Sequence, residues 1–311
     1  MVKYYTIDEK NFLISLNSFE NSKIIRLIDP SQEELEKIAK LANVEIDLLS
    51  AACDKEERPR IESDDNNHLI ILHIPYEDKT TEIPVITVAF GIVITKDFLI
   101  TVCSVETNLW ESLLKRKIET IYKQSTFALM CLISIKIADF YLKYIKMIQK
   151  KADLVEKELH KSMTNEMLIN MLNLEKSLVY FSTALKGNDL IWYKMQKIFH
   201  NKLSEEESEL IEDALIEFKQ AHDLTEIHSD ILSGMMDAFA SVISNNLNIV
   251  MKFLTSVTII LMIPTLITSA YGMNVENIPL ANVHYSFWIV MGFSFFLSLI
   301  GALIFWKKNL F

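Results

Sequence analysis

The chain has 311 residues, half of them hydrophobic, with 31 basic and 41 acidic residues and a formal net charge of −10. This acidic balance argues against nucleic-acid binding, which requires basic patches. The three cysteines, Cys53, Cys103 and Cys131, are widely spaced and form no CxxC pair. We therefore expect buried, reduced thiols in the cytosol and neither a disulfide framework nor a zinc site. No apolar h-region follows the first residues, so we expect no cleaved signal peptide.

The first 120 residues have the pattern of a mixed α/β domain. Runs rich in Ile and Val predict strands at 24–28, 69–74, 86–94 and 98–102. Lys96 and Asp97 form a tight turn between the last two strands. Ser31 and Glu34 form an S-x-x-E capping box that opens a helix ending near Leu41.

From Asn108 to Pro264 the pattern is helical, since no proline and only Gly187 and Gly234 interrupt it. Helices are predicted at 108–121, 125–162, 165–185, 189–199 and from Ser204 onward, with a turn at Gly187-Asn188-Asp189. Ser204 and Glu207 form a second capping box. The last helix would be a continuous rod of roughly 65 residues and about 100 Å. Two shorter helices that meet at Gly234 are the alternative.

The end of the chain contains two uncharged apolar stretches. No charged residue occurs from 253 to 275, and after Glu276 none occurs until Lys307. A bilayer core about 30 Å thick needs roughly 20 apolar residues in a helix, so we predict a helical hairpin in a membrane. The predicted parts are an α/β and helical domain, a stalk helix, a first span, a connector, a second span and a basic tail, at 1–203, 204–250, 251–272, 273–284, 285–306 and 307–311.

Charge predicts the orientation of this hairpin. Lys252 precedes the first span and Lys307 and Lys308 follow the second, whereas the connector has no Lys or Arg. Positive residues mark the cytoplasmic side of a membrane. We therefore expect both termini in the cytoplasm of a cell whose membrane the chain spans twice. The residues before Met251 hold 28 basic and 40 acidic residues, a net charge of −12, which suits a surface that meets cations or serves solubility.

The first span carries a polar stripe. At 100° per residue its members fall within an arc of about 80°: they are Thr255, Thr258, Met262, Thr265 and Ser269, and Asn248 and Met251 continue the spacing toward the stalk. Small and hydroxylated residues mediate packing between membrane helices. The same stripe would also suit a water-lined pore, which requires several copies because one helix cannot enclose a path. The second span, with Trp288 and Trp306 near its ends, is expected to face lipid.

The first span ends in Gly272-Met273-Asn274. Glycine ends helices in the left-handed conformation, and it also allows close approach of neighbouring copies. Asn274 offers a neutral amide oxygen, and a ring of such oxygens would hold a hydrated cation through its waters. Magnesium dehydrates reluctantly and usually keeps several waters. After a hydroxyl stripe, and before a short acidic loop and a second span, this tripeptide indicates a magnesium pore.

With these features the chain resembles the CorA family of magnesium transporters, two-span proteins with a Gly-Met-Asn signature. The resemblance covers most of the chain. It rests on 251–255, Tyr271-Gly272-Met273-Asn274 and Lys307-Lys308, with further similarity at Asp29-Pro30, 57–62 and 230–234.

The resemblance implies a funnel-shaped homopentamer whose first span lines a pore for Mg²⁺, with Co²⁺ or Ni²⁺ as further cargo. Gly272, Met273 and Asn274 would form its selectivity filter, and Glu276 would attract cations. The pore wall and gate would comprise Asn248, Met251, Leu254, Thr255, Thr258, Met262 and Thr265, with Leu254 and Met262 as hydrophobic constrictions. The family's proline directly follows the constriction methionine, whereas Ile263 intervenes here before Pro264, which leaves the register after Met262 open.

The resemblance also implies that Mg²⁺ bound between cytoplasmic domains holds the channel closed. Asp213 lies at the position of one acidic ligand, and Glu77 or Asp78 of a neighbouring subunit is the candidate partner. The alternative is a solvated helix face, because Asp213 follows a run of glutamates.

Three other functions are alternatives to a magnesium transporter. An enzyme is disfavoured, since the sequence has no P-loop, GxSxG or HExxH motif, and transport would be passive. A membrane-anchored sensor or scaffold would need no polar stripe. A zinc transporter of the same architecture tends to vary the middle residue of the motif, so Met273 favours magnesium.

Overall fold

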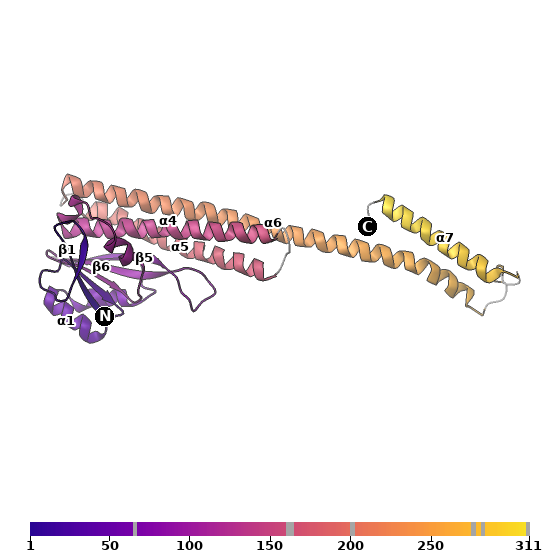
Figure 1. Cartoon of the computed structure of the whole chain (residues 1–311), viewed down its shortest axis with the longest axis horizontal. Coiled ribbons are helices and arrows are strands. Elements are labelled where there is room, and N and C mark those ends of the chain that lie inside the picture. The colour runs from indigo at the N-terminus through magenta and orange to yellow at the C-terminus, as the bar shows by residue number, and fades with distance from the viewer. Residues whose placement is uncertain (65–66, 160–164, 200–202, 275–277, 281–283, 309–311) are drawn as a thin grey trace. The chain divides into compact units, whose positions relative to one another are not determined.

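The computed structural model describes residues 1–64, 67–159, 165–199, 203–274, 278–280 and 284–308. The chain divides into two compact units, Met1–Gly234 and Met235–Phe311, which are described separately. Figure 1 shows the elements in chain order.

A seven-stranded sheet lies at the centre of the first unit, in the order β2-β1-β3-β7-β6-β5-β4. β3 and β7 pair in parallel, and the other neighbouring strands pair antiparallel. The strands are β1 (Val2–Ile7), β2 (Leu13–Leu16), β3 (Ile24–Ile28), β4 (Arg60–Asp64), β5 (Asn67–Tyr76), β6 (Ile86–Ile94) and β7 (Leu99–Cys103). The four predicted strands are confirmed as β3, β5, β6 and β7. β1, β2 and β4 were not predicted, because they are short or carry polar residues between the apolar ones.

One face of the sheet is covered by α1 (Gln32–Ala42), α2 (Ile46–Ser50) and the 3-10 turn η1 (Ala51–Cys53). The capping box is confirmed: the Glu34 N–H donates to Ser31 Oγ at 3.3 Å, and the Ser31 N–H donates to Glu34 Oε2 at 3.0 Å. Gly91 of β6 allows η1 to lie close, because a Cβ there would fall 2.4 Å from the Ala52 Cβ.

The other face is covered by the longer helices, and Figure 1 shows α4 and α5 beside each other over the sheet. These elements are α3 (Leu109–Leu114), the 3-10 turn η2 (Thr120–Lys123), α4 (Thr126–Leu159), α5 (Asn165–Phe199) and the start of α6 (Glu205–Tyr271). Their core contains the fully buried aromatic side chains Trp110, Tyr141, Phe181, Trp192 and Phe218.

The predicted helix at 108–121 is wrong, because α3 ends at Leu114. Beyond it the chain pairs with the β1–β2 loop: Lys117 forms a bridge with Phe12, and the Ile118 N–H donates to the Asn11 oxygen at 2.8 Å. Tertiary pairing therefore overrides helical propensity in this segment.

The predicted turn at Gly187-Asn188-Asp189 is also wrong, because α5 runs through it to Phe199. Gly187 serves packing instead, since a Cβ there would lie 2.8 Å from Pro59 Cγ. Asn188 is fully buried and binds the backbone of β5, accepting from the His73 N–H and donating to the His73 oxygen, each at 2.9 Å. The Gly-Asn pair thus holds a helix against a sheet.

α6 is a single helix of 67 residues that passes Gly234 and Pro264 without interruption. The prediction of one continuous helix is confirmed, and the alternative of two helices meeting at Gly234 is not. The second capping box is present as well. The Glu207 N–H donates to Ser204 Oγ, and the Ser204 N–H donates to Glu207 Oε2, each at 3.2 Å.

His73 predicts a loss of stability in acid. Burial lowers the pKa of its imidazole, and the hydrogen bond from Nε2 to the Glu57 oxygen at 2.8 Å opposes this shift. Below about pH 6.5 the unfolded chain therefore binds more protons than the folded one, so stability falls as pH falls. The thermal unfolding midpoint of the full-length protein should drop between pH 7 and pH 5, and His73→Gln should flatten that slope. Equal slopes for both proteins would contradict this assignment.

Candidate functional site: the α6–α7 hairpin

Among the residues that the structure describes, two helices are long and apolar enough to cross a membrane, α6 and α7 (Ser286–Lys307). Their most apolar segments are almost wholly exposed in the chain. The core helix of a soluble protein would have its apolar residues buried. This exposure therefore favours a lipid or protein surrounding for both segments.

A seam of small residues joins the two helices within the second unit. Ser256 of α6 and Val290 and Ser294 of α7 are buried. Gly301 of α7 lies against α6, because a Cβ there would fall 3.3 Å from the Cδ1 of Ile263. Small residues let membrane helices approach closely, so α7 covers the α6 face that includes Ser256 and Ile263.

The polar stripe lies on the other side of α6. At 100° per residue its centre is about 150° from the face that α7 covers. Every predicted residue of the pore wall is exposed in the chain: Asn248, Met251, Leu254, Thr255, Thr258, Met262 and Thr265. Because α6 is continuous through Pro264, Thr265 keeps the helical register of Thr258.

Two hydroxyls of the stripe donate to their own helix. Thr258 Oγ1 donates to the Leu254 oxygen at 2.8 Å, and Thr265 Oγ1 donates to the Leu261 oxygen at 3.0 Å. A hydroxyl has one proton and two acceptor lone pairs. With the proton used internally, each oxygen presents lone pairs outward. Such a surface accepts hydrogen bonds from water, and the waters around a hydrated cation point their protons outward.

The end of α6 differs from the left-handed ending considered from the sequence. The Gly272 N–H donates to the Thr268 oxygen at 3.0 Å and to the Ser269 oxygen at 3.2 Å, and no described glycine has a positive φ. The backbone therefore does not require glycine at this position. Met273 and Asn274 are exposed, and Glu276 lies outside the described residues.

The predicted regulatory residues lie on the surface of the first unit. Asp213 and Glu77 are exposed and Asp78 is half-buried. The Thr80 hydroxyl donates to Asp78 Oδ1 at 2.6 Å and its N–H at 2.9 Å, which lowers the pKa of Asp78. Among the described residues, no three His, Cys, Asp or Glu side chains are grouped to hold a metal ion. The regulatory metal site at Asp213 with Glu77 or Asp78 stays a prediction.

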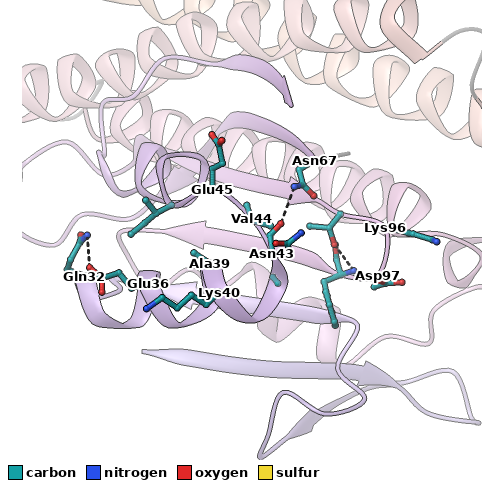
Figure 2. Close-up of a pocket in the computed structure, with 14 residues that line it drawn as sticks. Gln32, Glu36, Ala39, Lys40, Asn43, Val44, Glu45, Asn67, Lys96 and Asp97 are labelled. Carbon is teal, nitrogen blue, oxygen red and sulfur yellow. Dashed lines mark hydrogen bonds between the residues drawn. The ribbon is translucent and has the colours of Figure 1, made fainter. Parts of the chain in front are cut away.

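The first unit also contains an open groove of about 1240 Å³ beside α1. Figure 2 shows Glu36 and Lys40 on α1 and Lys96 and Asp97 on the β6–β7 turn around it. Asn67 Nδ2 donates to the Asn43 oxygen across the groove at 3.4 Å. Its lining carries both signs of charge, so it indicates no particular class of ligand.

The predicted burial of the three cysteines is confirmed at two of the three positions. Cys103 and Cys131 are buried and free, and Cys53 is free and half-buried. Burial raises the pKa of Cys103 to about 11 and raises the pKa of Cys131 further. At neutral pH these groups are protonated thiols, which are poor nucleophiles and poor metal ligands.

The sequence model of the CorA-like Mg²⁺ transporter protein family matches residues 19–308. The chain belongs to this family. It is 29% identical to the cobalt/magnesium transport protein CorA of Methanocaldococcus jannaschii, over 94% of this chain and 93% of that protein.

Solved structures agree with this CorA membership. The complete structure of the CorA magnesium transporter from Methanocaldococcus jannaschii superposes with a TM-score of 0.83 at 28% identity, over 98% of this chain and 96% of that one. The cytoplasmic domain of ZntB from Vibrio parahaemolyticus superposes with a TM-score of 0.58 at 12% identity, over 78% of this chain and 96% of that one. The second likeness shows a shared fold alone.

Sequence reasoning missed the seam through which this CorA protein joins its two spans. Ser294, Ser298 and Gly301 follow one another at steps of four and three residues. That spacing puts three small residues on one helix face, and it was the available signal. The expectation that the second span faces lipid takes no account of this helix face.

Proposed function

We propose that this protein conducts Mg²⁺, with Co²⁺ as further cargo, passively into the cytoplasm through a pore formed by five copies of the chain. The observation that carries the proposal is the exposed stripe of α6, which lies opposite the α7 seam and leads to Asn274. The membership of the CorA family and the names of its transporting relatives support the same cargo.

Self-assembly is supported by apolar residues that one chain leaves uncovered. On α5, Leu190 and Tyr193 are 54% and 56% exposed, and on α6, Ile216 is 60% exposed. Exposed apolar patches mark contact sites with other proteins or membranes. Several chains around one axis would cover such residues and would place the stripes of five α6 helices around a shared path.

The chemistry of the proposed path suits a hydrated ion. Gly272, Met273 and Asn274 form its outer ring, in which neutral amide oxygens bind the waters of Mg²⁺ without stripping them. Thr255, Thr258 and Thr265 accept hydrogen bonds from those waters farther in.

The remaining side chains along the proposed path form apolar constrictions or lie near its cytoplasmic end. Leu254 and Met262 form apolar constrictions that close by dewetting, and Met251 and Asn248 follow toward the cytoplasm. Glu276 would raise the local concentration of cations at the outer mouth.

The driving force would be the membrane potential. An inside-negative potential favours entry of a divalent cation by about 4–5 kcal/mol per 100 mV, twice the value for one charge. By the positive-inside rule, Lys252, Lys307 and Lys308 favour an orientation with both termini in the cytoplasm. Cytoplasmic Mg²⁺ bound between Asp213 of one subunit and Glu77 or Asp78 of the next would hold the pore closed.

A flux assay tests the proposal. Full-length protein in vesicles that contain a Mg²⁺-sensitive dye should take up Mg²⁺ at a saturating rate that rises with an inside-negative potential. Protein-free vesicles should not. Unchanged internal Mg²⁺ in the presence of protein would overturn the proposal and favour a membrane-anchored scaffold or sensor.

Competition with Zn²⁺ tests the choice of ion in the same vesicles. We expect Mg²⁺ uptake to persist at equal concentrations of Zn²⁺, because Met273 and the neutral ring suit a strongly hydrated ion. Uptake of Zn²⁺ without uptake of Mg²⁺ would contradict the magnesium assignment and favour a zinc transporter of the same fold.

A further inference from the structure

Pro264 removes one backbone hydrogen bond in the middle of the first span. Proline has no N–H, so the helical hydrogen bond to the carbonyl four residues earlier is missing. That carbonyl belongs to Ile260. In a bilayer no water is at hand, and an unsatisfied carbonyl costs several kcal/mol unless a neighbouring group supplies a donor.

A hydroxyl of the second span lies close enough to act as this donor. Ser298 Oγ of α7 lies 3.4 Å from the Ile260 oxygen and 3.1 Å from the Ser294 oxygen of its own helix. The single hydroxyl proton is therefore shared between two carbonyls, one on each helix. Gly301, nearly one turn farther along α7, keeps the helices close at this level, since a Cβ there would lie 3.3 Å from Ile263 Cδ1.

We propose that Ser298 is a positioning residue for the pore helix: its hydroxyl occupies the carbonyl that Pro264 frees and thereby fixes the stripe on the far side of α6. The consequence for transport rests on the proposed function, whereas the contact and its energetic coupling to Pro264 do not. Ser298 itself faces the α7 seam and touches no part of the proposed ion path.

The contact between Ser298 and Ile260 lies at the level where the two halves of the stripe meet, so it can affect the geometry of the proposed ion path. Met262 and Thr258 precede Pro264, and Thr265 follows it. A freed carbonyl within a helix is where a water or side chain inserts and a kink forms. Without Ser298 the two halves of the stripe would lose their common register at Pro264. Thr258 on the stripe donates to its own helix, whereas the Ser298 hydroxyl reaches from α7 to the Ile260 oxygen of α6.

A double-mutant cycle between Ser298 and Pro264 tests the proposal. Alanine at 264 restores the N–H that bonds the Ile260 oxygen, so Ser298 becomes dispensable. We expect Ser298→Ala to lower the folded-to-unfolded ratio of the full-length protein about threefold, the average for a hydrogen bond between membrane helices, and to slow Mg²⁺ uptake. In the Pro264→Ala background the same change should alter neither quantity.

Ser294→Ala is the matched control. Its hydroxyl is buried at the same seam but donates to the Val290 oxygen of its own helix at 2.8 Å, so we expect the same effect in both backgrounds. Ser298→Thr and Ser298→Val form a second test with equal side-chain shape, in which only the hydroxyl differs. Threonine should keep the coupling to Pro264 and valine should lose it.

The outcomes separate the two proposals. Equal losses from Ser298→Ala with and without Pro264, or equal behaviour of the threonine and valine variants, would overturn the positioning role. Absence of Mg²⁺ uptake by the unmodified protein would overturn the proposed function, while the unfolding cycle would still decide whether Ser298 serves Pro264.

Discussion

Replacement of Asn274 by alanine is expected to reduce Mg²⁺ uptake by the reconstituted protein to the level of protein-free vesicles. Asn274 is exposed just beyond the end of α6, where the proposed ring of amide oxygens binds the hydrated ion. Alanine removes every one of those oxygens at once, because each copy of the chain contributes one. A bare methyl ring offers the waters of Mg²⁺ no acceptor, and dehydration of this ion is costly. Dye fluorescence in vesicles under an inside-negative potential measures the loss.

Asn246→Ala is the control for this substitution. Asn246 is also an exposed asparagine of α6, but it lies about 140° around the helix from the centre of the stripe. Its replacement should leave uptake unchanged. Equal amounts of protein in the vesicles and equal unfolding midpoints would show that neither variant misfolds. If Asn274→Ala transported Mg²⁺ as well as Asn246→Ala does, the amide ring would be excluded as the selective element.

The sequence predicts those parts of the fold that depend on local chemistry. The capping boxes at Ser31 and Ser204 mark true helix starts, because a cap needs only residues within one turn. Strand β3 follows from four apolar residues around Arg26, and β6 follows from the apolar run 88–94; both segments are buried on both faces of the sheet. β1 and β2 consist mostly of partly or fully exposed residues, so they lack the continuous apolar run that marks a buried strand, and β2 lies at the edge of the sheet.

In the candidate site, too, the sequence predicts the local features and misses those that depend on distant partners. The stripe on α6 is a local pattern, so helical periodicity alone places Thr258 and Thr265 on one face. The seam on the opposite face depends on which helix packs there, and the role of Ser298 becomes visible only beside Ile260. Asp213 illustrates a third case, since its proposed partners belong to another subunit and one chain cannot supply them.

Asn188, in the segment 187–189 that the sequence wrongly predicts as a turn, binds the backbone of β5 at a position where the sheet lacks a strand partner. β4 pairs with β5 from Arg60, opposite Ile71, so the residue opposite His73 in this register is Arg58, which lies before the start of β4. The next β5 residue with both backbone groups facing this edge is His73. The side-chain amide of Asn188 satisfies both groups, so a helical residue takes the place of one missing rung of the sheet.

Asn188→Ala should therefore destabilise the first unit by about 2–4 kcal/mol. The His73 N–H would be left buried without its partner, at a cost of about 1–3 kcal/mol, and the vacated space adds a cavity term. The His73 oxygen would keep one donor, the Tyr141 hydroxyl at 3.0 Å, which keeps the loss below that of two orphaned groups. Chemical unfolding of the full-length protein, followed by the fluorescence of its buried tryptophans, measures the change.

Asn170→Ala provides the comparison, because Asn170 is an exposed asparagine of the same helix. Alanine has the higher helix propensity, so this control should be neutral or slightly stabilising. A true helix–helix turn at 187–189 would reverse the expectation for Asn188, since alanine would then extend two helices and cost little. Equal stability of the two variants would thus contradict the assignment of Asn188 as a substitute for a β4 rung, and a loss confined to Asn188→Ala would explain why α5 passes through a Gly-Asn-Asp sequence without ending.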